Sequence, residues 1–168
     1  MKHCCALIGI ALAMAGAPVV AGAQDATTPV TAAAPSLDIG TLDGGHFSLA
    51  AQRGKWVVIN YWATWCGPCV KEMPALSALA ARRDQVRVIG LDYEDTPRDD
   101  IEAFLAKHPV TYPVARVDPA DPPPGLAPPD VLPTTFVVAP DGELARTWVG
   151  PLDMHKLQAL IDSGKDAP

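Results

Sequence analysis

The chain has 168 residues, of which 49% are hydrophobic and 19% charged, and its formal net charge is −6. This length suits one domain with a hydrophobic core and a short extension. The negative charge, without a basic stripe, argues against nucleic-acid binding because few cations are available to replace the counterions of phosphate groups. No nucleic-acid partner is therefore expected.

The four cysteines divide into two pairs. Cys4 and Cys5 lie in an apolar leader, so Cys66 and Cys69 are the only cysteines in the rest of the chain. Two thiols without competitors suit an oxidising compartment, where stray thiols would be a liability. A structural zinc pair is the alternative, but zinc needs about four ligands, and no second Cys or His pair at metal spacing follows.

Residues 1–23 have the three parts of a secretory signal peptide: a basic start, an apolar run from Ala6 to Val20, and a small-residue cleavage site ending at Ala23. An uncleaved N-terminal membrane anchor is the alternative, because this run approaches the ~20 residues that span a bilayer. Residues 24–36 are rich in Ala, Thr and Pro without periodicity, which predicts a disordered linker. Residues 37–168 are predicted to form the folded domain.

The Cys66-Gly67-Pro68-Cys69 motif lies between a predicted strand and a predicted helix. Residues 55–61 are largely β-branched and aromatic, which predicts a buried strand. The unpaired N–H groups and the positive dipole end of the following helix favour a thiolate at Cys66. This helix is expected to kink at Pro74 and to place four apolar residues on one face: Val70, Met73, Leu76 and Leu79.

The rest of the domain alternates between predicted strands and helices, which favours parallel strands joined by right-handed crossovers, followed by an antiparallel hairpin. Thr96 is expected to begin one helix as its cap, and Asp153 to cap the last helix. The predicted elements are a hairpin over 37–49, a strand over 86–91, a helix from 96 to before 109, a strand over 112–117, two strands over 136–138 and 143–149, and a helix from 153 to near 164.

The segment 118–130 is unusual because it contains six prolines. So many prolines cannot form a regular helix beyond a first turn, so an extended or single-turn loop is expected. The loop has two interpretations: a variable surface loop, or a wall of a substrate groove, since it leads directly into the motif that begins at Val131.

The run from Asn60 to Pro74, with Trp-Cys-Gly-Pro-Cys at its centre, resembles the thioredoxin superfamily and within it the extracytoplasmic TlpA/ResA branch. This resemblance implies an α/β, thioredoxin-like fold, with a central mixed sheet flanked by helices and an N-terminal β-hairpin. It also implies a thiol–disulfide oxidoreductase whose redox-active group is a Cys66–Cys69 disulfide, without a cofactor or a metal.

The resemblance assigns three catalytic residues. Cys66 is expected to be the nucleophile and the more exposed thiol, and Cys69 to resolve the mixed disulfide. Thioredoxin has an aspartate where this chain has Asn60, which cannot accept a proton. Glu72 matches the glutamate of TlpA/ResA-type proteins, so we expect it to take the proton from Cys69; a solvated glutamate on the helix surface is the alternative.

Substrate-binding residues are expected on both sides of the cysteine pair. Trp65, Gly67 and Pro68 belong to the motif itself. Trp62 and Trp65 are expected to wall the site, and partly buried packing is the alternative for both. Leu132 and Pro133 resemble the family's cis-proline loop, in which the residue before the proline pairs through its backbone with an extended substrate peptide. The cis form is inferred from the resemblance.

The resemblance implies protein disulfides as substrates, including those of apocytochromes c or of metal-site proteins during their assembly, and a membrane thiol donor of electrons. A periplasmic or otherwise extracytoplasmic monomer is expected. Two alternatives are a disulfide-forming oxidant and a non-enzymatic copper or thiol carrier, since two thiols suit a soft metal such as Cu(I). A peroxidase on the same fold is disfavoured, because Ile59 and Ala63 stand where its Pro and Thr/Ser would precede Cys66.

Overall fold

A computed structural model describes residues 35–82, 84–123 and 125–164. The predicted signal peptide and nearly all of the predicted linker lie outside the described residues. The elements are β1 (Asp38–Gly40), β2 (His46–Ser48), a 3-10 helix (Ala50–Gln52), β3 (Trp56–Trp62), α1 (Gly67–Ala80), β4 (Val86–Tyr93), α2 (Arg98–Lys107), β5 (Val114–Val117), β6 (Thr134–Val138), β7 (Leu144–Val149) and α3 (Met154–Ser163).

A five-stranded mixed sheet with the order β5-β4-β3-β6-β7 forms the centre of the domain. The strand β3 is buried along its whole length. It pairs in parallel with β4, where Ile59 lies opposite Ile89, and antiparallel with β6, where Ile59 lies opposite Phe136. A central strand that is buried on both faces requires a continuous apolar run, which is the pattern that predicted it. The central mixed sheet expected from the sequence is confirmed.

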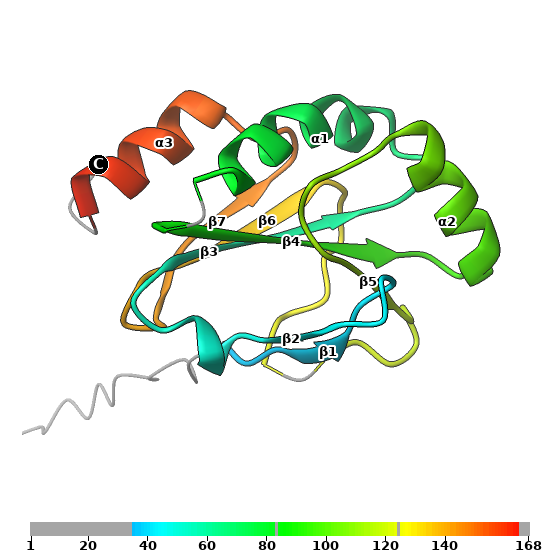
Figure 1. Ribbon diagram of the computed structural model, residues 1–168, viewed down its shortest axis with the longest axis horizontal. Helices are drawn as coiled ribbons and strands as arrows, with labels where there is room; N and C mark the ends of the chain where they lie inside the picture. The colour runs from blue at the N-terminus through cyan, green and yellow to red at the C-terminus, as the bar shows by residue number, and fades with distance from the viewer. Residues whose placement is uncertain (1–34, 83, 124, 165–168) are drawn as a thin grey trace, which may run out of the picture. The chain divides into compact units, whose positions relative to one another are not determined.

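The two faces of the sheet are covered by different kinds of structure (Figure 1). The three helices contribute to the core on one face, through residues such as Leu76, Ile101 and Leu157. The β1–β2 hairpin and the segment that precedes β6 contribute to the core on the other face, through Phe47 and Leu126 among others. The predicted N-terminal hairpin is present as a separate two-stranded sheet.

The helix ends follow the sequence predictions only in part. Asp153 caps α3 as predicted, because its side chain accepts hydrogen bonds from the backbone N–H groups of His155 and Lys156. The predicted cap of α2 is wrong: Pro97 precedes the helix without a side-chain cap, and the Thr96 hydroxyl donates instead to Glu94 at 3.0 Å. The Thr96 hydroxyl thus binds a carboxylate, and the N-cap position falls to Pro97, whose side chain has no hydrogen-bonding group.

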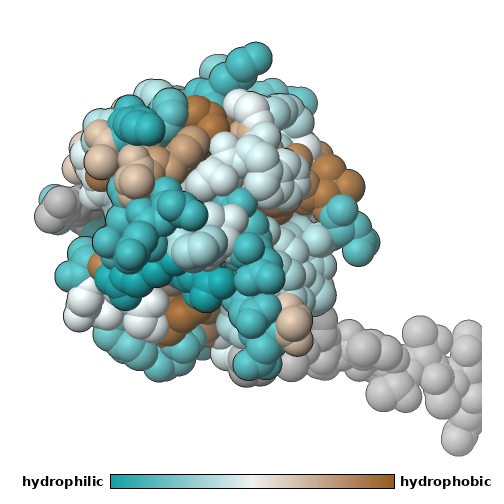
Figure 2. Space-filling model, turned by 90° about the vertical axis from the view of Figure 1, so that its right-hand side faces the viewer, coloured by the Kyte–Doolittle hydropathy of each residue, from teal (hydrophilic) through white to brown (hydrophobic). Residues whose placement is uncertain are grey.

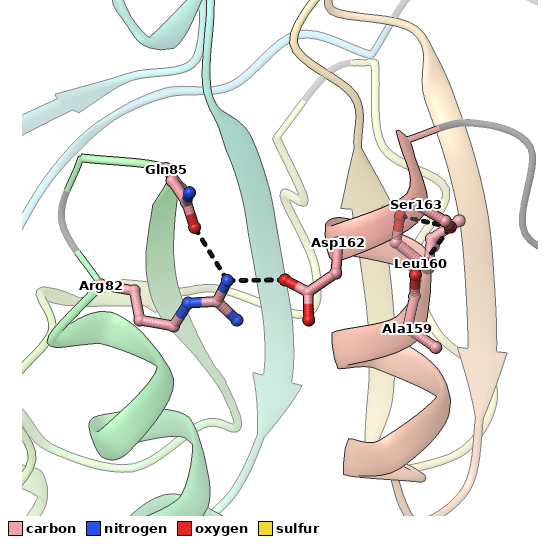
Figure 3. A network of polar contacts seen from close by, with 6 residues as sticks. All are labelled: Arg82, Gln85, Ala159, Leu160, Asp162 and Ser163. Carbon is pink, nitrogen blue, oxygen red and sulfur yellow. Dashed lines mark hydrogen bonds and ion pairs between the residues drawn. The ribbon is translucent and has the colours of Figure 1, made fainter.

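The helix α1 continues through Pro74 to Ala80. Its buried side differs from the predicted apolar face, because Val70 is only half-buried whereas Glu72 is buried. The end of α1 lies beside α3, where the guanidinium of Arg82 donates to Asp162 at 2.6 Å and to Gln85 at 2.8 Å (Figure 3). Such a partly exposed ion pair contributes about 1 kcal/mol or less to stability.

The segment 118–133 crosses from the edge strand β5 to β6, which lies beside β3. Its described residues form turns and bends without a helix or a strand, as the prolines predicted. Leu126 is 5% exposed and belongs to the core on the face of the sheet that the β1–β2 hairpin covers. The segment is therefore part of the core as well as a surface loop, because it covers a face of the sheet that no described helix covers.

Replacing Leu126 by Ala should lower the free energy of unfolding by about 2 to 4 kcal/mol, since the substitution removes buried methyl groups and leaves a cavity. Urea denaturation measures this change. The control is Leu144→Ala, which removes the same atoms from an exposed leucine and should cost about 0.5 kcal/mol or less. Equal losses in the two variants would contradict a core role for Leu126.

Candidate active site

The two cysteines of the motif form a disulfide at the start of α1, with an S–S distance of 2.00 Å. Cys66 is the residue that caps the helix, and its sulfur accepts a hydrogen bond from the backbone N–H of Cys69 at 3.3 Å. Cys66 is 4% exposed and Cys69 is fully buried. The sulfur of Cys66 therefore lies at the helix N-terminus, where N–H groups stabilise a thiolate after reduction.

The cis-proline loop lies at the same end of the sheet as the cysteine pair. The Leu132–Pro133 peptide bond is cis, as the resemblance implied. Thr134, which follows Pro133, pairs with Tyr61 near the end of β3, so the chain that enters β6 lies near the chain that leaves β3 for Cys66. The carbonyl oxygen of Pro133 accepts a hydrogen bond from Gly150 at 2.8 Å. The backbone that follows β7 thus braces this loop.

Glu72 is buried one helical turn after Cys69, with only 8% of its surface exposed. One carboxylate oxygen accepts from the side-chain amide of Asn60 at 2.8 Å, and the other accepts from the backbone N–H of Leu152 at 3.0 Å. Burial raises the pKa of Glu72, although these two hydrogen bonds partly offset the effect. The alternative interpretation of Glu72 as a solvated surface residue is therefore wrong.

Asn60 connects Glu72 to the sheet. Its amide nitrogen donates both to Glu72 and, at 3.0 Å, to the hydroxyl of Thr135 on β6. All three side chains are buried. An amide at this position cannot accept a proton, but its hydrogen bond holds the carboxylate of Glu72 in place.

The remaining motif residues differ in exposure. Trp65 is 69% exposed, and Gly67 and Pro68 are also exposed. Val131, just before the cis-proline loop, is exposed as well. Trp62, by contrast, is fully buried in the core above the sheet, where it stacks on Phe104 at a centroid distance of 5.7 Å. Trp62 is therefore a core residue and does not wall the site.

Two acidic residues near the motif were missed by the sequence analysis. Glu94 is buried and accepts hydrogen bonds from the backbone N–H of Thr64 at 2.6 Å and from its hydroxyl at 3.1 Å. Asp92 is fully buried, and burial together with the neighbouring charge of Glu94 raises its pKa to about 8. Alternate residues of a strand face the same side of the sheet. Val86, Val88, Gly90 and Asp92 alternate along β4, so this pattern could have indicated that Asp92 faces the helices.

A separate groove of about 1000 Å³ lies away from the cysteine pair, between α2, the hairpin turn and the edge of β4. It exists because β5 begins opposite Gly90 and leaves the first half of β4 without a neighbour on that side. The side of the molecule that carries α2 has a mostly hydrophilic surface with small apolar patches (Figure 2). No cysteine lines this groove, so it is not part of the candidate site.

Within the described residues, no helix is both long and apolar enough to cross a membrane. The same part of the chain contains no group of three or more His, Cys, Asp or Glu side chains arranged to hold a metal ion.

Comparison with known proteins identifies the family. The family model of AhpC/TSA matches residues 30–147. The chain belongs to the AhpC/TSA family. Thiol-disulfide oxidoreductase ResA of Bacillus cereus is 30% identical over 130 residues, which are 76% of this chain and 74% of that relative. Thioredoxin-like protein YneN of Bacillus subtilis is 30% identical over 135 residues, which are 77% of this chain and 76% of that relative.

Solved structures agree with this assignment. A DsbF homologue from Corynebacterium diphtheriae matches with a TM-score of 0.68 and 27% identity, over 78% of this chain and 85% of that one. A thiol:disulfide interchange protein of the thioredoxin family from Chlorobium tepidum matches with a TM-score of 0.63 and 25% identity, over 79% and 94% of the two chains. The protein is a thiol–disulfide oxidoreductase of the ResA type with a thioredoxin-like fold.

Replacing Asn60 by Ala should lower the free energy of unfolding by about 1 to 3 kcal/mol, because it leaves the buried carboxylate of Glu72 without one donor. The hydrogen bond from Asn60 lowers the pKa of Glu72, so its loss raises that pKa further. Glu72 then keeps its proton to a higher pH in the native state than in the unfolded state. The native state therefore loses stability as the pH rises through the raised pKa of Glu72. The loss should therefore be larger near pH 8 than near pH 5 in urea denaturation.

The matched control is Thr135→Val, which removes the other partner of the Asn60 amide and leaves both donors to Glu72 in place. Its stability loss relative to the unsubstituted chain should not depend on pH. A pH-independent loss in the Asn60→Ala variant would show that this residue does not tune the charge of Glu72.

Proposed function

We propose that the protein reduces disulfides of other proteins outside the cytoplasm, with Cys66 as the nucleophile and Cys69 as the resolving thiol. The observation that carries this proposal is the position of the cysteine pair at the start of α1, with the buried carboxylate of Glu72 one turn further along the same helix. The helix N-terminus favours the attacking thiolate, and the carboxylate provides a proton acceptor for the second thiol.

The reaction has two exchange steps. In the reduced protein, the thiolate of Cys66 attacks one sulfur of the substrate disulfide, and the other substrate sulfur leaves as a thiolate. Cys69 then loses its proton and attacks the sulfur of Cys66 in the mixed disulfide. The substrate leaves as a dithiol, and two electrons have passed from the protein to the substrate. The product is the Cys66–Cys69 disulfide found in the structure.

Glu72 acts in the second step as the base for Cys69. A fully buried thiol such as Cys69 resists ionisation, because burial disfavours the charged form. The pKa of Glu72 is raised from its ordinary value, which brings this carboxylate closer to a thiol in basicity than an exposed glutamate would be. Its two hydrogen bonds, from Asn60 and Leu152, hold it without adding a competing acid.

An exposed apolar surface at this end of the domain would receive the substrate. Trp65 is exposed beside Cys66, and Val131 is exposed two residues before Pro133. Gly67 and Pro68 leave the start of α1 open to an approaching chain. The backbone of Leu132 would pair with an extended substrate segment, so the site favours a cysteine in an unfolded or extended stretch with an apolar neighbour.

The N-terminal sequence supports a compartment outside the cytoplasm. Residues 1–23 have the pattern of a secretory signal peptide, so the protein would work in the periplasm or otherwise outside the cytoplasm, and we propose that it does so as a monomer. A membrane thiol protein would return it to the reduced state. Its substrates would be disulfides in apocytochromes c or in metal-site proteins during assembly.

Replacing Glu72 by Gln should slow the release of substrate from the mixed disulfide by about 10²-fold near neutral pH, the lower range for loss of a general base. The unsubstituted protein should gain rate as the pH rises through the raised pKa of Glu72 and then level off. The variant should keep gaining rate with hydroxide over that range. Stopped-flow measurement of the Trp fluorescence change on release of substrate gives both profiles.

Glu102→Gln is the matched control, because Glu102 is an exposed glutamate on α2 that pairs with Arg98. Its profile should equal that of the unsubstituted protein. If Glu72→Gln also left the pH profile unchanged, Glu72 would not be the base.

The direction of electron flow is tested by the reduction potential of the Cys66–Cys69 pair, measured by equilibration against a thiol redox buffer. A reductase should have a value at or below roughly −230 mV, on the thioredoxin side of the scale. The Gly-Pro pair between the cysteines, shared with thioredoxin, supports this expectation. A value near roughly −120 mV would identify a disulfide-forming oxidant instead.

A further inference from the structure

Two buried acidic residues have no part in the exchange steps described above. Asp92 is the seventh residue of β4, and Glu94 follows the end of that strand. Asp92 is completely inaccessible to solvent, and Glu94 is 6% exposed. Two carboxyl groups are costly to bury unless they have hydrogen-bond partners. Their place beside the turn that leads to Cys66 therefore requires an explanation.

Glu94 holds the turn that leads to Cys66. One of its carboxylate oxygens accepts from the backbone N–H of Thr64 at 2.6 Å, and the other accepts from the hydroxyls of Thr64 and Thr96 at 3.1 and 3.0 Å. Thr64 lies inside the turn that the N–H of Cys66 closes by donating to the carbonyl of Ala63 at 3.1 Å. Glu94 therefore fixes the backbone two residues before the nucleophilic sulfur.

In the sheet register, Asp92 of β4 pairs with Trp62 of β3 on one side and with Arg116 of β5 on the other. Neither of its carboxyl oxygens has a donor within hydrogen-bond distance among the described residues. An ionised carboxylate without donors is strongly disfavoured there, whereas a neutral acid supplies its own proton as a donor. Burial and the charge of Glu94 accordingly raise the pKa of Asp92 to about 8.

The charges that act on Asp92 come from the loop after β4 and from β5. Glu94 raises its pKa, and Arg116 lowers it. Arg116 is also engaged elsewhere, because its guanidinium donates to the carbonyl of Thr96 at 2.9 Å and pairs with the exposed Asp95 at 3.5 Å. On the other side, Trp62 of β3, which pairs with Asp92 in the sheet register, carries no charge. The neutral acid is the form these surroundings favour.

We propose that Asp92 is a positioning residue that acts through Glu94: the neutral acid donates its proton in a hydrogen bond to Glu94, which keeps Glu94 bound to Thr64. When Asp92 loses this proton to solvent, two negative charges face each other in a buried place, and the hold of Glu94 on Thr64 is weakened. The turn before Cys66 is then no longer fixed. Through this pair, the geometry of the nucleophile depends on pH.

The Thr64 amide reports on this link directly. In the oxidised full chain labelled with ¹⁵N, the chemical shift of this amide should change with a midpoint near pH 8, the pKa to which Asp92 is raised. Asp92→Asn keeps a donor toward Glu94 and cannot lose a proton, so this midpoint should disappear. Asp95→Asn makes the same atomic replacement at an exposed neighbouring residue, and this variant should retain the midpoint near pH 8.

The second readout uses the reduced full chain and rests on the proposed nucleophilic role of Cys66. The rate of alkylation by iodoacetamide should rise as the thiol ionises and then fall in the unsubstituted protein above about pH 8, whereas Asp92→Asn should hold a plateau. The difference should reach about tenfold at the highest pH, within the ~10²-fold cost of a misplaced reacting group. A purely structural role for Asp92 would change stability without removing this fall.

Glu94→Gln provides a second variant if Asp92→Asn fails to fold. Glutamine keeps a carbonyl oxygen for the Thr64 N–H but removes the charge beside Asp92, so the midpoint of the Thr64 transition should move to lower pH. The proposal is overturned if Thr64 does not titrate near pH 8, if Asp92→Asn titrates as before, or if Asp95→Asn abolishes the transition. The Thr64 readout on oxidised protein involves no exchange reaction, so its failure is distinct from failure of the proposed function.

Discussion

The buried carboxylate of Glu72 is the interaction on which the arrangement of the site depends. It accepts one hydrogen bond from Asn60 on β3 and one from the backbone of Leu152 after β7, while its own backbone belongs to α1. Three segments that are distant in sequence are thereby held at one point. A carboxylate can be buried only when such donors compensate its lost hydration, so the start of α1 and its cysteine pair have a fixed place over the sheet.

Two groups of buried carboxylates lie near the cysteine pair, and they differ in their hydrogen bonds. Glu72 follows Cys69 and has donors for both oxygens, and its burial raises its pKa. Glu94 binds the turn that precedes Cys66, and its neighbour Asp92 has no donor among the described residues. In the roles proposed above, the first carboxylate serves proton transfer, and the second pair serves the position of the backbone. The difference comes from the number of donors each oxygen receives.

The covering of the sheet follows the same physical logic. Three helices cover one face, whereas the hairpin and the 118–133 segment cover the other (Figure 1). Prolines prevent a regular helix in that segment, so loop leucines supply its apolar contact: Leu126 is buried in this core and Leu132 packs against it. At the end of the domain that carries the disulfide, Trp65 is exposed.

The sequence by itself determined the features that depend on local pattern. These are the strand before Cys66, the helix after Cys69, the cap at Asp153 and the loop made by the prolines, because periodicity, capping and φ restriction act over a few neighbouring residues. The family and the chemistry of the cysteine pair also follow from one short motif.

Tertiary structure alone decided which polar groups are buried and what they bind. Asn60 and Glu72 are 12 residues apart, and Thr64 and Glu94 are 30 residues apart, so no local pattern could join them. For the same reason Thr96, which has the sequence of a helix cap, binds Glu94 instead. Whether a glutamate is solvated or buried depends on the donors that other strands and loops bring to it, and these are fixed only when the sheet register places β3, β4 and β6 side by side.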